Sequence, residues 1–170
     1  WLISKLKEEY GEERAQAIFE GLLQRNKASI RVTDLSRKEE IKALLGASDS
    51  LLSPAGLVKE QGHFAGHDLF AEGSITIQDE SSQLVAPTLE LQGDEQVLDA
   101  CAAPGGKTAH MASYLTTGQV MALDLYDHKL TLIQENAQRL GVADRVQTQK
   151  LDARKVHEFF GKDQFDKILV

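Results

Sequence analysis

The chain has 170 residues, of which 42% are hydrophobic and 26% charged, a balance typical of a soluble globular protein rather than a disordered one. Its single cysteine excludes an intrachain disulfide and favours a reducing, cytoplasmic compartment, and no apolar run reaches the roughly 20 residues of a membrane span. The net charge of −7 argues against nucleic-acid binding by overall charge, although a basic groove can lie on one face of an acidic protein.

The first part of the sequence predicts a small α/β unit. The spacing of apolar residues predicts, in chain order, helices over 2–10 and 15–23 with a break at Gly11, a strand over 28–33, and a helix that carries Ile41, Leu44 and Leu45. Thr33 or Asp34 is expected to cap the last of these helices, which Gly46 ends.

A segment rich in Ser, Gly and His follows, over 47–73, with short strands expected only around 57–58 and 69–70. This composition is typical of a linking region. We therefore predict two domains, with the small α/β unit over 1–72 and a second domain over 73–170.

The same segment contains two histidines, His63 and His67, at the spacing of metal ligands on a helix. Gly62 and Gly66 disfavour a helix there, and no second cluster of ligand residues accompanies them. No metal site is predicted.

Beyond residue 73, strands and helices alternate. The expected order is strand 75–77, helix 81–91, strand 96–100, helix 107–115, strand 120–124, helix 128–140, strand 146–151, helix 153–160 and strand 165–170. Such alternation predicts a parallel, doubly wound sheet. The last strand reads as buried and stops without a turn signal, so we expect an incomplete sheet within a longer protein.

The loop after the strand over 96–100 is the candidate ligand site, because ligands of such sheets bind at the carboxyl ends of the strands. Its residues are mostly small, which lets the backbone approach a ligand closely. They are Cys101, Ala102, Ala103, Pro104, Gly105, Gly106 and Lys107.

Two phosphate-binding motifs are incomplete in this loop. Gly106-Lys107-Thr108 resembles the end of a P-loop, but Cys101 stands where that motif requires its first glycine. The spacing G-x-G-x-x-G of dinucleotide sites is also absent. A ligand with ribose and adenine but no pyrophosphate fits such a loop, and S-adenosyl-L-methionine is the candidate.

Two acidic residues at strand ends support this interpretation. Asp124 ends the next strand, about 20 residues after the glycine turn, where a carboxylate usually accepts hydrogen bonds from ribose hydroxyls. Asp152 ends the strand after that, where it is expected to reach the adenine amino group. The alternative is that both residues cap the following helices.

The run 98–108, Leu-Asp-Ala-Cys-Ala-Ala-Pro-Gly-Gly-Lys-Thr, resembles the cofactor-binding motif of the Sun/RsmB family of ribosomal RNA 5-methylcytosine methyltransferases. The stretches 75–83, 122–125 and 151–154 are similar to the segments that flank this motif in the family. The leading segment resembles the small α/β region that adjoins the family's catalytic domain.

This resemblance implies a Rossmann-like, S-adenosylmethionine-dependent methyltransferase sheet that acts on cytosine C5 of ribosomal RNA, with 16S RNA as the expected substrate. It also implies that a cysteine thiolate attacks cytosine C6 and that a second cysteine helps to remove the C5 proton. Both cysteines are expected beyond Val170, so no catalytic residue is assigned within this chain. Cys101 is expected to line the cofactor loop.

Two alternatives stay open at this point: a nucleotide hydrolase that uses Gly106-Lys107-Thr108, and a non-catalytic RNA-binding module. The sequence does not decide the oligomeric state or the role of Lys107. His110 and His128 are expected at the surface.

Overall fold

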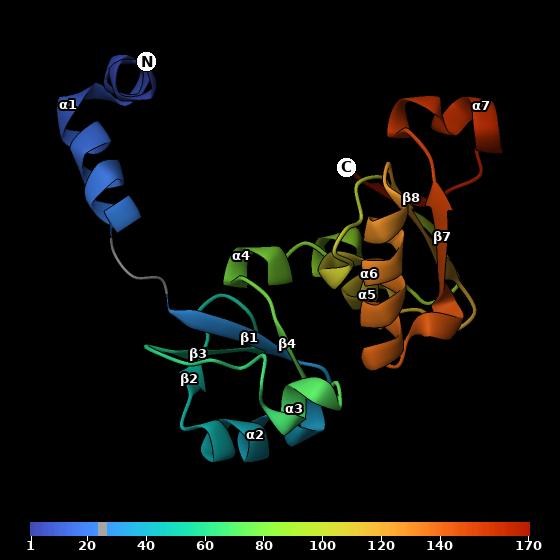
Figure 1. Ribbon diagram of the computed structural model, residues 1–170, viewed down its shortest axis with the longest axis horizontal. Coiled ribbons are helices and arrows are strands. Elements are labelled where there is room, and N and C mark those ends of the chain that lie inside the picture. Colours follow the sequence, from blue (N-terminus) through green and yellow to red (C-terminus); the bar gives the residue numbers. More distant parts are fainter. Residues whose placement is uncertain (24–26) are drawn as a thin grey trace.

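The computed structural model describes residues 1–23 and 27–170. Helix α1, Leu2–Leu23, stands apart from two sheet units (Figure 1). At Gly11 its backbone leaves the helical region with φ 78°, so the predicted break is confirmed. Among the described residues, no helix is long and apolar enough to cross a membrane.

The first sheet is antiparallel, with strand order β2-β3-β1-β4. Its strands are β1, Ala28–Val32; β2, Ser48–Asp49; β3, Gly56–Lys59; and β4, Ile75–Ile77. Helices α2, Lys38–Leu45, and α3, Asp68–Ala71, accompany it, and Asp34 caps the short 3-10 turn Leu35–Arg37 that precedes α2. Ile30, Ile41, Leu57 and Ile75 are central to its core.

Two details of this unit differ from the sequence interpretation. The strand expected around 69–70 is wrong: the segment forms α3, and His67 caps it by accepting a hydrogen bond from the Leu69 N–H at 3.1 Å. In addition, β4 pairs with β1, with Ile77 opposite Ile30. The antiparallel sheet therefore continues past residue 72, although the domain boundary itself stays a prediction.

The second sheet is parallel, with strand order β7-β6-β5-β8. Its strands are β5, Gln96–Asp99; β6, Gln119–Asp124; β7, Val146–Lys150; and β8, Lys167–Leu169. The helices are α4, Glu80–Gln83; α5, Gly106–Ala112; α6, Asp127–Arg139; and α7, Val156–Phe160. The predicted parallel sheet, preceded by a small α/β unit, is confirmed.

The helix expected over 81–91 is wrong. Helix α4 ends at Gln83, and Pro87 begins a separate 3-10 turn that ends at Leu89. Proline has no N–H to donate and clashes with the preceding turn, so it cannot continue a helix begun upstream. Gln83 and Ala86 are buried, whereas Leu84 is 37% exposed.

Strand β8 was expected to be buried and is instead half exposed. It pairs with β5, and Leu169 packs against the core cluster that contains Val97 and Met111. Ile168 points to the opposite face of the sheet and is 54% exposed. One face of this strand therefore contributes to the core.

Arg139, at the end of α6, links the parallel unit to the antiparallel one. Its Nη1 donates to the carbonyl oxygens of Phe70 at 2.8 Å and Ile75 at 3.2 Å, and its Nη2 donates to Thr76 Oγ1 at 3.3 Å. The guanidinium carbon lies 4.0 Å from the centroid of the Phe70 ring. One side chain thus satisfies several polar groups of the other unit.

We expect Arg139→Met, which keeps the aliphatic stem, to lower the free energy of unfolding by about 1.5–3 kcal/mol, because carbonyls facing it lose a charged donor. The control is Arg37→Met, since Arg37 pairs with Glu40 at 3.2 Å on the surface and such pairs contribute about 1 kcal/mol or less. Urea denaturation measures both. Equal losses would contradict a special role for Arg139 in joining the units.

Candidate functional site

The glycine loop between β5 and α5 is fixed to the neighbouring elements. The Ala102 N–H donates to the Leu123 carbonyl at the end of β6 (2.9 Å), and Asn136 Nδ2 of α6 donates to the Pro104 carbonyl (3.1 Å). Gly105 has φ 97°, and a Cβ there would lie 3.0 Å from the Ile133 Cα. Glycine is therefore required at this turn, and the loop approaches α6 closely.

Two cavities flank this loop and share Cys101 and Ala103 in their walls. The first, here called the strand-end cavity, has a volume of about 260 Å³. Its lining residues come from the ends of β5, β6 and β7 and the start of α6. They are Ala100, Cys101, Ala103, Asp124, Leu125, Tyr126, Lys129, Leu151 and Ala153.

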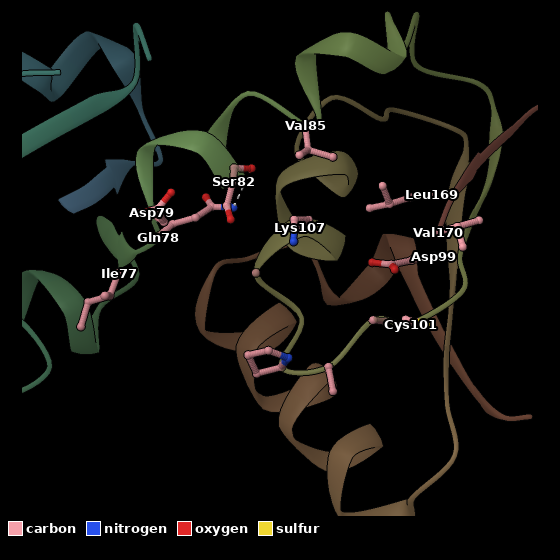
Figure 2. Close-up of a pocket in the computed structure, with 14 residues that line it drawn as sticks. Ile77, Gln78, Asp79, Ser82, Val85, Asp99, Cys101, Lys107, Leu169 and Val170 are labelled. Atoms are coloured by element: carbon pink, nitrogen blue, oxygen red, sulfur yellow. Dashed lines mark hydrogen bonds between the residues drawn. The ribbon is translucent and has the colours of Figure 1, made fainter. Parts of the chain in front are cut away.

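The second, here called the Gln78 cavity, has a volume of about 380 Å³. It lies between the segment that joins the two units and the other side of the glycine loop (Figure 2). Its lining residues are Ile77, Gln78, Asp79, Ser82, Val85, Asp99, Cys101, Ala102, Ala103, Pro104, Gly106, Lys107, Leu169 and Val170. The loop thus lines both spaces.

Asp124 lies in the wall of the strand-end cavity, with only 10% of its side chain exposed. Its Oδ1 accepts a hydrogen bond from the Leu125 N–H at 2.7 Å, and Lys129 Nζ lies 3.7 Å from the same oxygen. Among the described residues, none donates a hydrogen bond to Oδ2. One carboxylate oxygen is therefore available to a ligand with hydroxyl groups.

The carboxylate of Asp152 is occupied by its own segment. It caps the turn that follows by accepting from the Arg154 N–H at 3.0 Å, and Arg154 Nη2 approaches it to 2.6 Å. The hydrogen bonds from Arg154 lower the pKa of Asp152 to about 2. Leu151 and Ala153 line the strand-end cavity in its place, so the structure brings the loop and Asp124 together but leaves the adenine contact of Asp152 a prediction.

Asp99 and Lys107 both line the Gln78 cavity. Asp99 is buried, and burial raises the pKa of its carboxyl above the usual 3.8, while a hydrogen bond from Thr108 and the charge of Lys107 act in the opposite direction. The Thr108 hydroxyl donates to Asp99 Oδ2 at 2.7 Å. This hydrogen bond ties the start of α5 to the end of β5.

The sequence interpretation assigned no role to several wall residues of the Gln78 cavity, among them Gln78, Asp79 and Ser82. These three belong to the stretch 75–83, which was assigned no role although its similarity to the family was visible. The surface placement of His110 is wrong, since the side chain is 3% exposed. His128 is exposed as expected.

Within residues 1–23 and 27–170, no three His, Cys, Asp or Glu side chains are grouped so as to hold a metal ion. His67 uses its Nδ1 to cap α3, as described above.

A glycine loop after the first parallel strand and an acidic residue at the end of the next one define a nucleoside-type cofactor domain. The crystal structure of a methyltransferase homolog protein from Pyrococcus horikoshii is 27% identical to this chain, with a TM-score of 0.81 over 95% of the chain and 54% of that protein. The structure of PH0851 is 31% identical, with a TM-score of 0.88 over 99% of the chain and 40% of that protein. The fold is that of a methyltransferase domain.

The family model of the 16S rRNA methyltransferases RsmB/F matches residues 86–170, and the chain belongs to this family of S-adenosylmethionine-dependent enzymes. A relative from Bacillus subtilis, a probable ribosomal RNA small subunit methyltransferase B, is 40% identical over 177 aligned residues. The alignment covers all of this chain and 39% of the relative. The chain therefore spans about two fifths of that relative's length.

Proposed function

We propose that this chain binds S-adenosyl-L-methionine and forms the cofactor side of an enzyme that methylates cytosine C5 in 16S ribosomal RNA. The observation that carries the proposal is that Asp124 and the small-residue loop face one cavity at the ends of adjacent strands. Family membership supports the reaction and the RNA substrate. Such a substrate places the protein in the cytoplasm.

The strand-end cavity suits the adenosine part of the cofactor. Asp124 Oδ2 is the proposed acceptor for the ribose hydroxyls, because Oδ1 already accepts from Leu125. Leu125 and Leu151 offer apolar surface to the adenine ring. The backbone of residues 101–107 lies where the methionine part would pass toward the Gln78 cavity.

S-adenosyl-L-methionine supplies an electrophilic methyl group when bound. This chain's residues bind and orient it, and in this proposal the nucleophilic thiolate comes from a cysteine outside residues 1–170. Cys101 lines both cavities and is proposed as a contact of the cofactor rather than as the nucleophile. No metal ion is part of the proposal.

Calorimetric titration with S-adenosylhomocysteine tests the cofactor site. We expect Asp124→Ala to weaken binding about 10- to 100-fold, because buried ribose hydroxyls lose a charged acceptor. Asp127→Ala, which changes an exposed aspartate paired with Lys150, should leave affinity unchanged. Asp152→Ala in the same titration decides whether that carboxylate contributes.

Parallel experiments separate the alternatives. Binding of Mg-ATP instead of S-adenosylhomocysteine would favour a nucleotide hydrolase. Binding of S-adenosylhomocysteine by a full-length protein that transfers no methyl group to 16S ribosomal RNA would favour a non-catalytic RNA-binding module.

A further inference from the structure

The wall of the Gln78 cavity opposite the glycine loop contains an amide whose direction is fixed by a buried arginine. Gln78 follows β4 and is 7% exposed, and its Oε1 accepts a hydrogen bond from Arg31 Nε at 2.8 Å. Arg31 lies on β1 of the antiparallel sheet and is 3% exposed. The antiparallel unit thus controls one side chain of a cavity that the parallel unit completes.

Arginine carries donors only, so the oxygen of the Gln78 amide must face Arg31 and its NH₂ group must face the other way. That NH₂ group reaches the Ser82 carbonyl at 3.5 Å, which is the outer limit of a hydrogen bond. Gln78 and Ser82 both line the cavity. Gln78 therefore presents a donor that is poorly satisfied by the protein itself.

Burying Arg31 is costly to the fold. Among the described residues, no carboxylate pairs with Arg31, and its Nε donates to the neutral amide of Gln78. A buried charge without an ionic partner lowers stability, and burial lowers the pKa of the Arg31 guanidinium to about 10.

The position of Gln78 suits the acceptor substrate rather than the adenosine of the cofactor. The Gln78 side chain extends toward Lys107 across the cavity (Figure 2). Cys101 and Ala103 line both this space and the strand-end cavity. If adenosine occupies the strand-end cavity, the group to be methylated must enter on the Gln78 side of the loop.

We propose that Gln78 recognises the target pyrimidine by donating from Nε2 to an acceptor on the edge of the base, and that Arg31 is the positioning residue for this contact. Enzymes that modify a base read an extruded nucleotide through hydrogen bonds to its Watson–Crick edge, and on cytosine that edge offers O2 and N3 as acceptors. This inference rests on the proposed function, because it takes the acceptor to be a cytosine.

The test uses the full-length protein, with methyl transfer to 16S ribosomal RNA transcribed in vitro and S-adenosylhomocysteine titration measured side by side. Gln78→Glu keeps the contact with Arg31 but replaces the donor by an acceptor. We expect kcat/KM for RNA to fall about 10- to 100-fold, with S-adenosylhomocysteine affinity within twofold of wild type. Gln92→Glu, the same change at an exposed glutamine, is the control.

Arg31→Lys tests the positioning role. It retains the charge but loses the planar donor group, and we expect a smaller fall in kcat/KM for RNA with unchanged cofactor affinity. Circular dichroism and thermal melts establish that each variant is folded. If Gln78→Glu does not fold, Gln78→Asn, which keeps the amide but draws it back by one methylene, is measured instead, with the same expectation.

A parallel loss of S-adenosylhomocysteine affinity in the Gln78 variants would overturn the inference, because the amide would then serve the amino-acid end of the cofactor. Unchanged methylation would overturn it as well and would leave Gln78 a purely structural residue. If the wild-type protein binds no S-adenosylhomocysteine, the proposed function itself is wrong, and that result is distinct from a failure of the Gln78 contact.

Discussion

Gly73→Ala is expected to lower the free energy of unfolding by about 3–5 kcal/mol, at the upper end of single-residue effects. Gly73 lies just before β4, has φ 82° and packs against the end of α6. A Cβ at this position would lie 2.0 Å from the Arg139 carbonyl oxygen. That neighbour is backbone, so relief requires the antiparallel unit to shift against α6.

The matched control is Gly141→Ala, which separates the backbone strain of a positive φ from the steric clash of the added Cβ. Gly141 also has a positive φ, 70°, but a Cβ there meets no atom within 4 Å. Its cost should be about 1–2 kcal/mol, the penalty of the left-handed conformation alone. Urea denaturation of both variants gives the comparison. If Gly73→Ala is as stable as Gly141→Ala, the prediction is wrong, and the backbone around Arg139 shifts at little cost to make room for the Cβ.

The parts of the site that the sequence predicted well are those encoded locally. The small-residue loop lies between a strand and a helix in direct succession, and Asp124 ends the next strand. In a parallel sheet the carboxyl ends of adjacent strands meet at one edge. The pairing of β5 with β6 thus brings the loop and Asp124 together, as the periodicity of the chain predicts.

The Gln78 cavity could not be predicted in this way. Its wall depends on β4 pairing with β1, where Ile77 lies opposite Ile30. No local pattern specifies an antiparallel partner across so many residues, because the alternation of a strand fixes its faces but not its neighbour. The role of Gln78 follows from that pairing, since it sets Arg31 beside the amide.

His110 shows a second limit of sequence periodicity. Helix α5 is buried on all sides from Thr108 to Ala112. The sequence pattern of this helix therefore does not distinguish a buried face from an exposed one. Histidine is intermediate among the amino acids in how often it is buried. From the sequence, His110 is therefore expected at the surface. Only the packing of α5 against α4, α6 and the parallel sheet places this ring in the interior.

Acid is expected to destabilise the protein through His110. Burial, with the nearby charge of Arg31, lowers the pKa of His110 from 6.5 to about 3. Its Nδ1 has no hydrogen-bond partner among the described residues, and its Nε2 lies 3.4 Å from the Tyr114 hydroxyl. The folded state therefore offers little to stabilise a protonated ring.

The sign of the effect follows from where the proton binds. Above about pH 6.5 the ring is neutral in both the folded and the unfolded state, and His110 adds no pH dependence. As the pH falls from 6.5 toward 3, the unfolded state takes up a proton that the folded state does not, so stability is lost over this range. The slope approaches about 1.4 kcal/mol per pH unit.

Urea denaturation between pH 8 and 4.5 measures this loss in the wild type, in His110→Gln and in His128→Gln. Other groups also titrate in this range, so the prediction concerns the difference between proteins. We expect the wild type and His128→Gln, whose ring is exposed, to lose about 2–3 kcal/mol more than His110→Gln by pH 4.5. Equal slopes in all three would contradict this prediction and would mean that the folded state stabilises the protonated His110 ring as well as the unfolded state does.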